Sequence, residues 1–600
     1  MSTVIPAPSP RPIDVDALRF LPDGARQERR CSVCGTIAMH AVVLEVPSLA
    51  DPRLILTLLR CGTCGSAFYE PPGIVDFSEL GQQRDDFWRF YVEVGGGVWE
   101  TIWPILAAAG SGSLLDVGCG FGFALDFWTR TGRGEACGVE LADYGVTGAQ
   151  KLGVTIYSQL LEQCVPLSGR RFDVVYASEV IEHVPDPQAF VTLLSRWLAD
   201  DGVLILTTPN AAFITPENRS TTLLAALAPG FHGFLLSPQA FEDAVRAAGF
   251  PHVQVLVLNE RLFLWASRRE LKVEHDYAAL YQPYFQFLES RLAATEADAA
   301  VWQGYAYRYL RDLVNTGRYA DARRVADLLC ASVTRSHGAD LLDPAHTAPR
   351  FATATSLTEN GRIGPFFLPG LYYLLGDLAW RGRRDAQQAR AFYAGAVAAI
   401  KACARIGSIF YLEAISMYWP SRVALAKLDL KQGRLAAAAE MATELATTGD
   451  DCSAAHAFAL APPSLIESLV PKVADVCLAR GAVTEAIRVS AAYRDYVTRR
   501  YGAAMLELAG IEAALDGRTV TMPLDPLFPI WFEGVRTAAE AGDAPDGAAL
   551  HAVIRLGEKF AAHPTCGQRL RERAARARER AGLPPAKIVF EMAATRLSSG

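Results

Sequence analysis

The glycine-rich stretch at residues 118–122 constrains the fold of this chain more than any other feature of its sequence. The apolar run 113–118 leads into it, a helix-like segment follows at residues 123–130, and the stretch itself reads Gly118, Cys119, Gly120, Phe121, Gly122. A strand, a glycine turn and a helix in this order are typical of nucleotide-binding α/β folds. Gly118 and Gly120 have no Cβ, so a ligand can approach their backbone closely, and the helix presents free N–H groups at its start. The stretch therefore predicts a site for a nucleoside-bearing cofactor.

Short apolar runs alternate with helix-length segments through this part of the chain. The runs lie at residues 113–118, 135–141, 153–157, 172–177 and 203–208. Such alternation predicts a parallel, doubly wound sheet. Two further runs, 253–258 and 262–266, flank a turn-forming Asn-Glu pair and predict a closing antiparallel hairpin. We therefore expect a Rossmann-like α/β domain over residues 76–268.

An acidic residue follows the glycine stretch at the spacing that a ribose-binding carboxylate requires. Glu140 ends the second apolar run, where a carboxylate can accept hydrogen bonds from both ribose hydroxyls. A carboxylate at this position rejects a phosphorylated ribose. The stretch alone is compatible with an NAD site, but the dinucleotide fingerprint requires a glycine where Phe123 stands.

Motifs later in the chain favour a different cofactor. Residues 172–187, 198–210 and 231–250 resemble, in the correct order, the later motifs of class I S-adenosylmethionine (SAM)-dependent methyltransferases. Around residue 179 the sequence is similar to the O-methyltransferases of quinone biosynthesis. The resemblance implies a SAM site formed by Asp116, Gly118, Cys119, Gly120, Gly122, Glu140, Leu141 and Ser178.

One position departs from the family pattern. After the third apolar run the family commonly has an acidic residue near the adenine amine, whereas residues 157–160 here read Tyr157, Ser158, Gln159, Leu160. Ser158, Gln159 or backbone groups could take the place of that acid.

A histidine follows the strand whose end should face the cofactor. A hydroxyl acceptor must lose its proton, so His183 is the first candidate for a general base. Glu179, Glu182 and His183 have the i, i+3, i+4 spacing of one helix face, and in the quinone-biosynthesis family the matching residues have been linked to a divalent cation. The alternative is that Glu182 and His183 only brace the helix. His232 is the second candidate base, in a segment where a structural role is favoured.

Four cysteines form two CxxC pairs near the N-terminus. Cys31 and Cys34 precede Gly35, and 26 residues later Cys61 and Cys64 precede Gly65. Four thiolates that close a tetrahedron are typical of structural zinc and leave no open position for catalysis. The runs 42–46 and 54–59 predict the hairpin of a zinc ribbon over residues 31–75, with buried free thiols as the alternative. Such a ribbon also resembles the amino-terminal module of bacterial methyltransferases that act on sugars and other small molecules.

The remaining residues, 269–600, carry almost no strand signal. A glycine followed by small or aromatic residues at helical spacing recurs four times, beginning at Gly317, Gly382, Gly433 and Gly481. The pattern resembles degenerate tetratricopeptide (TPR) repeats, although its intervals of 65, 51 and 48 residues depart from their period of about 34. An irregular helical bundle is the alternative.

Charge and hydropathy exclude some classes of function. A net charge of −7 gives no global basic field, so nucleic acid is disfavoured as a partner. The arginine-rich stretch 569–580 contains interleaved alanines and glutamates and reads as a solvated helix face. No apolar run is long enough to span a bilayer. Residues 1–30 lack the features of a secretion signal and predict a disordered lead-in, which favours a cytoplasmic location.

Together these patterns predict a SAM-dependent methyltransferase that acts on a small-molecule or glycan acceptor, at oxygen. The helical region would then bind a protein partner or position the acceptor. One alternative is a methyltransferase of RNA or protein that docks through the ribbon and the repeats. Another is a scaffold with a vestigial methyltransferase domain, against which the intact Asp116, Gly118, Gly120 and Glu140 argue.

Overall fold

The computed structural model describes ten segments of the chain, namely residues 18–21, 24–51, 53–71, 87–95, 98–216, 218, 220–294, 299–406, 412–448 and 463–501. These residues fall into two compact units that divide between Ser421 and Arg422. The predictions for the start of the lead-in and for the arginine-rich stretch 569–580 lie outside the described residues. Among the residues described, no helix has both the length and the apolar character needed to cross a membrane.

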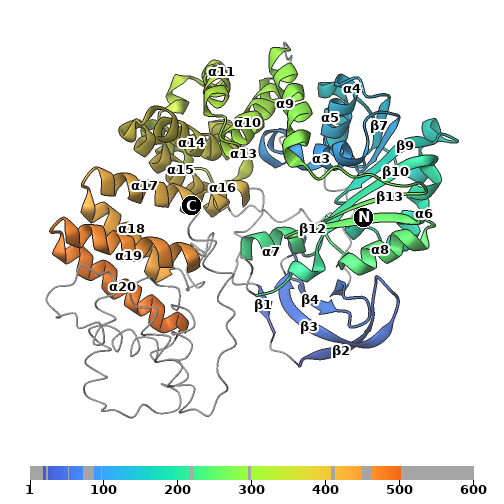
Figure 1. The fold of residues 1–600 in the computed structure, drawn as a ribbon, viewed down its shortest axis with the longest axis horizontal. Helices are drawn as coiled ribbons and strands as arrows, with labels where there is room; N and C mark the ends of the chain where they lie inside the picture. The colour runs from blue at the N-terminus through green and yellow to red at the C-terminus, as the bar shows by residue number, and fades with distance from the viewer. Residues whose placement is uncertain are drawn as a thin grey trace, which may run out of the picture. The chain divides into compact units, whose positions relative to one another are not determined.

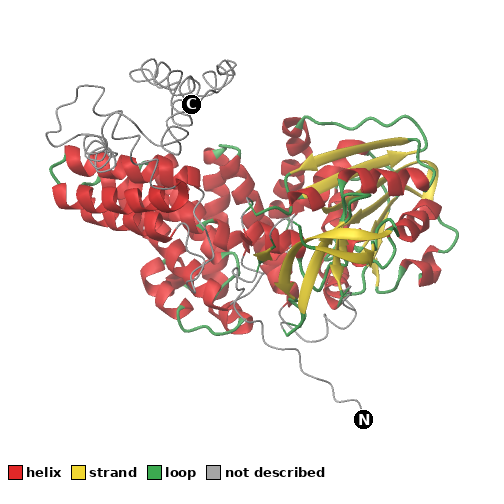
Figure 2. Cartoon of the chain, turned by 90° about the horizontal axis from the view of Figure 1, so that it is seen from below, coloured by secondary structure: helices red, strands yellow, loops and turns green. Residues whose placement is uncertain are grey.

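A seven-stranded sheet forms the centre of the first unit, in the order β12-β13-β10-β9-β6-β7-β8 (Figures 1 and 2). Its parallel strands are β6 (Leu114–Val117), β7 (Ala136–Val139), β8 (Thr155–Tyr157), β9 (Phe172–Ser178) and β10 (Leu198–Pro209). The antiparallel hairpin β12 (His252–Leu258) and β13 (Arg261–Ser267) closes one edge. The predicted α/β sheet and its closing hairpin are confirmed. The strand order reverses between β6 and β9, the place where ligands bind in open α/β sheets.

Helices cover both faces of this sheet. Alternate residues of the central strands belong to two separate hydrophobic clusters, because successive side chains of a strand point to opposite faces. The helices α3 (Val98–Ala108) and α4 (Phe123–Arg130) contribute to one cluster, and α6 (Pro187–Trp197) and α8 (Pro238–Ala247) contribute to the other. The other described α-helices of this domain are α2 (Phe87–Phe90), α5 (Asp143–Leu152) and α7 (Ser220–Leu227).

A second, antiparallel sheet contains the predicted ribbon hairpin. It consists of β1 (Arg19–Phe20), β2 (Arg26–Arg30), β3 (Ile37–Pro47), β4 (Ile55–Arg60), β5 (Ala67–Glu70) and β11 (Phe234–Leu235). β1 and β2 lie within residues 1–30, so the prediction of a disordered lead-in is wrong for these two strands. β2 reads Arg-Gln-Glu-Arg-Arg and has no apolar alternation, because it is a largely exposed edge strand held by backbone pairing with β3.

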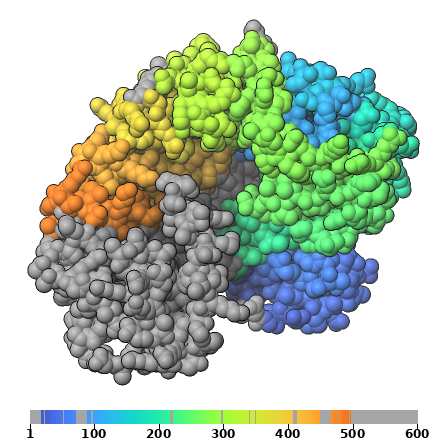
Figure 3. Space-filling model, viewed as in Figure 1, coloured from blue at the N-terminus to red at the C-terminus, as the bar shows by residue number. Residues whose placement is uncertain are grey.

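The helical part of the chain begins with α9 (Tyr277–Ala293), α10 (Ala299–Asn315) and α11 (Tyr319–His337). It continues with α12 (Pro344–Phe351), α13 (Leu357–Ile363), α14 (Leu368–Asp377), α15 (Ala386–Ile406) and α16 (Leu412–Ser416). These helices belong to the same compact unit as the Rossmann-like domain, so this unit extends well beyond the predicted boundary at residue 268. In the space-filling view, the yellow-green surface of this helical part borders that domain, where α9 packs against α3 (Figure 3).

The second unit contains most of α17 (Tyr418–Lys431), together with α18 (Leu435–Thr448), α19 (Pro463–Ala479) and α20 (Val483–Tyr501). Gly317, Gly433 and Gly481 lie in left-handed turns between successive helices, with φ of 77°, 75° and 80°. The predicted glycine turns are confirmed at these three positions. Gly382 instead lies inside the π-helical turn Leu378–Arg383. The resemblance to TPR repeats stays a prediction.

Candidate functional site

The glycine loop follows β6 at the carboxyl edge of the sheet. Gly118, Gly120 and Gly122 have backbone φ angles of 72°, 57° and 93°, which residues with a Cβ atom rarely adopt. The N–H groups of Gly118 and Cys119 donate to the carbonyl of Val139, which ties the loop to the end of β7. The Cys119 side chain is buried. The loop is thus fixed by its positive φ angles and by these hydrogen bonds, and side chains of Val180, Tyr91 and Ile156 lie close against its three glycines.

Glu140 lies directly beside this loop. Its carboxylate accepts hydrogen bonds from the N–H of Gly120 at 3.0 Å and from the N–H of Ala142 at 2.9 Å. Burial raises the pKa of Glu140, while these backbone donors act in the opposite direction. Each carboxylate oxygen keeps acceptor capacity for a further hydrogen bond. The geometry therefore fits the predicted contact with two ribose hydroxyls, and Leu141 follows at the same edge.

Asp116 lies in β6, two residues before the loop begins. Its side chain is 3% exposed, and burial, followed by the charge of Glu140, raises its pKa to about 8. A carboxyl group held partly protonated in this way is ready to ionise when a cation binds beside it. Such a cation is what the sulfonium and amino groups of SAM provide. At the edge strand β8, Ser158 and Gln159 are both exposed, so either remains accessible to an adenine ring.

One aromatic residue in the site was missed by the sequence predictions. Tyr91 begins a π-helical turn, Tyr91–Gly95, directly after the short helix α2 (Phe87–Phe90). Its ring lies parallel to Tyr144 at 5.0 Å and to Phe123 at 6.1 Å between ring centroids. A Cβ added at Gly120 would lie 2.6 Å from its hydroxyl oxygen. The dense aromatic run at 87–91 was the signal available, but nothing local indicated that it reaches the loop.

The structure corrects the predicted helix face of Glu179, Glu182 and His183. Glu179 has φ of 56°, and only residues Ile181–His183 form a single 3-10 turn, so the three residues do not share an α-helix. The Glu179 carboxylate accepts a hydrogen bond from the Thr207 hydroxyl at 3.0 Å. The Ser178 hydroxyl in turn lies 2.8 Å from the Thr207 hydroxyl. A left-handed non-glycine residue at the end of a central strand is typical of functional sites.

Glu182 and His183 instead meet His232. One ligand atom of each of the three residues lies within 4.8 Å of the others. Nδ1 of His183 lies 2.9 Å from the Phe231 carbonyl oxygen. Nδ1 of His232 lies 3.0 Å from the Ala226 carbonyl oxygen. A carbonyl only accepts hydrogen bonds, so each Nδ1 carries the proton and each Nε2 is the basic nitrogen.

The carboxyl group of Glu182 is buried within this cluster. Its Oε2 accepts from the Thr208 hydroxyl at 3.0 Å, whereas its Oε1 is buried without a hydrogen-bond partner, 3.9 Å from Nε2 of His232. Burial, followed by the charge of Glu179, raises the pKa of Glu182 well above its usual value. Burial also lowers the pKa of both histidines. The cluster therefore holds two basic nitrogens and one orphaned oxygen at the carboxyl edge of the sheet.

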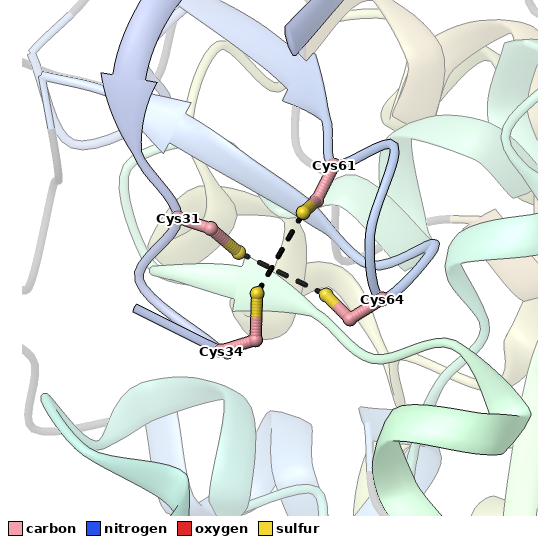
Figure 4. Close-up of side chains that lie close together, drawn as sticks. All are labelled: Cys31, Cys34, Cys61 and Cys64. Atoms are coloured by element: carbon pink, nitrogen blue, oxygen red, sulfur yellow. Dashed lines mark hydrogen bonds between the residues drawn. The ribbon is translucent and has the colours of Figure 1, made fainter. Parts of the chain in front are cut away.

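The four N-terminal cysteines converge at one end of the ribbon sheet (Figure 4). The Sγ atoms of Cys31 and Cys64 lie 3.8 Å apart, and those of Cys34 and Cys61 lie 3.7 Å apart. A zinc ion with four Zn–S bonds of about 2.3 Å would separate its sulfurs by about 3.8 Å in a regular tetrahedron. The four thiols form no disulfides. The donor set and its spacing thus fit the predicted zinc ion.

The ribbon is joined to the segment that carries His232. β5 pairs with β11, and the Ser237 hydroxyl donates to the Cys64 carbonyl at 2.6 Å. The Tyr69 hydroxyl donates to the Leu227 carbonyl at 2.9 Å. On the other side, the N–H of Gly233 donates to the Glu182 carbonyl. The ribbon therefore supports the wall of the site that contains the histidines.

Comparisons with known proteins identify the α/β domain. The family model described as a methyltransferase domain matches residues 100–255. A ubiquinone biosynthesis O-methyltransferase of Cereibacter sphaeroides (strain ATCC 17029) is 31% identical over 183 residues, which cover 28% of this chain and 72% of the relative. The protein of the same description from Ruegeria pomeroyi is 30% identical, with the same coverage.

Solved structures add a distant likeness. A putative O-methyltransferase from Nostoc punctiforme PCC 73102 is 17% identical, with a TM-score of 0.25 over 32% of this chain and 65% of that chain. This TM-score is too low to support an inference. The matched segment 100–255 contains both the glycine loop and Glu140, and the alignment spans more than two thirds of the curated relatives. The chain therefore belongs to the family of SAM-dependent methyltransferases.

Proposed function

We propose that this chain transfers the methyl group of SAM to a hydroxyl group of a small-molecule or glycan acceptor. The pair His183 and His232 beside Glu182 carries the proposal, because a hydroxyl acceptor needs a base close to the methyl donor. The curated relatives are named O-methyltransferases, which supports oxygen as the methylated atom.

SAM supplies an electrophilic methyl carbon on a sulfonium, and the protein has to align an acceptor oxygen with that carbon in a water-poor pocket. Because Nδ1 of His183 donates to the Phe231 carbonyl, Nε2 is the nitrogen that would accept the hydroxyl proton. Burial lowers the pKa of His183, so its imidazole is neutral at pH 7 and able to act as a base. The oxygen–carbon bond forms as the carbon–sulfur bond breaks, and the electron pair stays on sulfur.

Replacing His183 with Asn tests this role. The Asn amide can still donate to the Phe231 carbonyl, but the variant has no basic nitrogen at this position. We expect kcat to fall about 10² to 10⁴-fold with the SAM dissociation constant unchanged. His252→Asn, at an exposed histidine of β12, is the matched control. Steady-state kinetics with a hydroxylated acceptor that the wild type methylates give the answer, and a kcat within about threefold of wild type would remove His183 as the base.

A divalent cation bound by Glu182, His183 and His232 is a second role for this cluster. The orphaned Oε1 of Glu182 supports it, because a buried carboxylate oxygen without a partner is costly unless a ligand satisfies it. Two imidazole nitrogens and one carboxylate oxygen are a common ligand set for divalent metals. Such a cation would polarise the acceptor oxygen and stabilise its deprotonated form. His232 here takes the place that the sequence pattern gave to Glu179.

Paired glutamine variants separate the two possible ligand sets. Glu182→Gln removes the charge but keeps an acceptor for the Thr208 hydroxyl, and Glu179→Gln does the same for Thr207. We expect Mn²⁺ binding to be lost in Glu182→Gln and retained in Glu179→Gln. The binding is measured as a decrease in the electron paramagnetic resonance signal of free Mn²⁺. Wild-type protein that binds no Mn²⁺ would contradict the cation site, and loss in both variants would restore Glu179 as a ligand.

The competing assignments are less well supported. Methyl transfer to RNA or protein predicts a basic, aromatic docking groove, and the names of the curated relatives lend it no support. Membership of an enzyme family favours an active methyltransferase over a scaffold with a vestigial domain. We also infer that Cys31, Cys34, Cys61 and Cys64 hold a structural zinc ion, because their four sulfurs leave no position for an acceptor.

A further inference from the structure

The turn Tyr91–Gly95 lies between the glycine loop and the helical part of the first unit. On one side, the Tyr91 ring is stacked with both Tyr144 and Phe123, and its hydroxyl lies against Gly120. Burial raises the pKa of this hydroxyl, as do the nearby charges of Glu140, Cys119 and Asp116. Tyr91 therefore presents a protonated phenol, a hydrogen-bond donor, to the region where the loop and Glu140 meet.

On its other side, the turn is held by a buried arginine of α10. Arg308 is 1% exposed, and its guanidinium donates to the carbonyls of Tyr91 at 3.3 Å, of Glu93 at 3.3 Å, and of Val92. These are three consecutive carbonyls of the turn. One helical turn earlier, Gly304 packs so closely that an added Cβ would overlap the Val92 carbonyl oxygen. A buried cation bound to backbone carbonyls fixes the path of this segment.

A second set of contacts holds the same turn from the region around α13. Glu93 is buried, pairs with Arg89 at 2.5 Å and accepts from the N–H of Phe366 at 2.5 Å. Arg89 in turn donates to the carbonyls of Gly361 at 2.7 Å and Gly364 at 3.2 Å. Both sets of contacts come from segments that follow the methyltransferase domain in sequence, namely α10 and residues 361–366.

We propose that the helical region completes the SAM site of this enzyme, with Tyr91 as a cofactor-binding residue and Arg308 as the residue that positions it. Contacts with α10 and the α13 region fix the conformation of the turn. The turn in turn fixes the position of Tyr91 against the glycine loop. The methyltransferase domain alone, without residues 299–366, would lack the support of this turn. The proposal rests on SAM as the methyl donor and is independent of the acceptor and of the metal sites.

SAM binding to the full-length chain, measured by isothermal titration calorimetry, tests this coupling. We expect Tyr91→Ala and Arg308→Met each to raise the SAM dissociation constant about tenfold or more, which is the effect of losing one well-placed contact. Tyr91→Phe, which keeps the stacked ring and loses the donor, should lie between Tyr91→Ala and wild type. Arg324→Met is the matched control, because Arg324 forms an exposed ion pair with Glu289 in the same helical region.

The double variant Tyr91→Ala/Arg308→Met distinguishes positioning from a merely structural role. If Arg308 acts through Tyr91, its replacement costs no further affinity once the tyrosine ring is gone. The proposal would be overturned if the SAM dissociation constant of the double variant rose by the product of the two single-variant effects. Unchanged or tighter SAM binding by Tyr91→Ala would also overturn it. If Arg308→Met does not fold, the Tyr91 variants together with Arg89→Met decide the question in the same way. Wild-type protein that binds SAM but methylates no hydroxyl would instead refute the proposed acceptor chemistry alone.

Discussion

Replacing Glu140 with Ala is expected to reduce the affinity for SAM about 10² to 10⁴-fold. The carboxylate is the predicted acceptor for two ribose hydroxyls, and each hydrogen bond to a charged group contributes about 1.5–3 kcal/mol. The same side chain accepts from the N–H groups of Gly120 and Ala142, so its loss also frees the loop that should contact the cofactor. Isothermal titration calorimetry with SAM measures the change directly.

Glu135→Ala is the matched control for this experiment. Glu135 immediately precedes β7, on the same segment as Glu140, but its side chain is exposed and pairs with Arg170 at the surface. We expect this variant to bind SAM like the wild type. Thermal unfolding of both variants separates a local loss of contacts from a loss of fold. A folded Glu140→Ala variant with wild-type affinity would exclude Glu140 from the cofactor site.

The parts of this molecule that depend on local pattern were predictable from sequence. The five parallel strands, the helix after the glycine loop and the closing hairpin all follow from apolar runs and turn residues that act over short distances. The position of Glu140 follows from its place at the end of β7, because neighbouring parallel strands present their carboxyl ends at the same edge. The cysteine quartet was equally legible, since each CxxC turn forms half of the cluster by itself.

The parts that depend on contacts between distant segments were not predictable. His232 meets Glu182 because β11 joins the ribbon sheet, and neither residue carries a local sign of that pairing. Tyr91 lies against the glycine loop on a turn whose carbonyls accept hydrogen bonds from Arg308, more than two hundred residues later. Glu179 was placed on a helix by its spacing, but the chain turns through a left-handed conformation there. Spacing alone does not reveal such a turn when the residue is not a glycine.

Removal of zinc is expected to destabilise the ribbon and, through it, the acceptor side of the site. Structural zinc contributes strongly to folding, with binding free energies of about 10–16 kcal/mol in small zinc domains. Cys61→Ser breaks the predicted tetrahedron, so we expect this variant to lose its zinc and to unfold at a lower temperature. The ribbon supports the His232 segment through the pairing of β5 with β11 and through hydrogen bonds to Ser237. These bonds reach the histidine side of the site and not the glycine loop. The kcat for methyl transfer should therefore fall more than the affinity for SAM.

Cys330→Ser provides the matched control, because Cys330 lies on α11 and is not part of the cysteine cluster. Zinc content by atomic emission, thermal unfolding and SAM titration are measured on the wild type and both variants. Full-length protein purified without bound zinc, and without stabilisation on its addition, would contradict the zinc site. Loss of SAM affinity in parallel with kcat in Cys61→Ser would mean that the ribbon supports the whole domain. A decrease in kcat alone would mean that the ribbon acts through the His232 segment. This segment is bonded to the ribbon through β11 and to the Glu182 carbonyl through the Gly233 N–H.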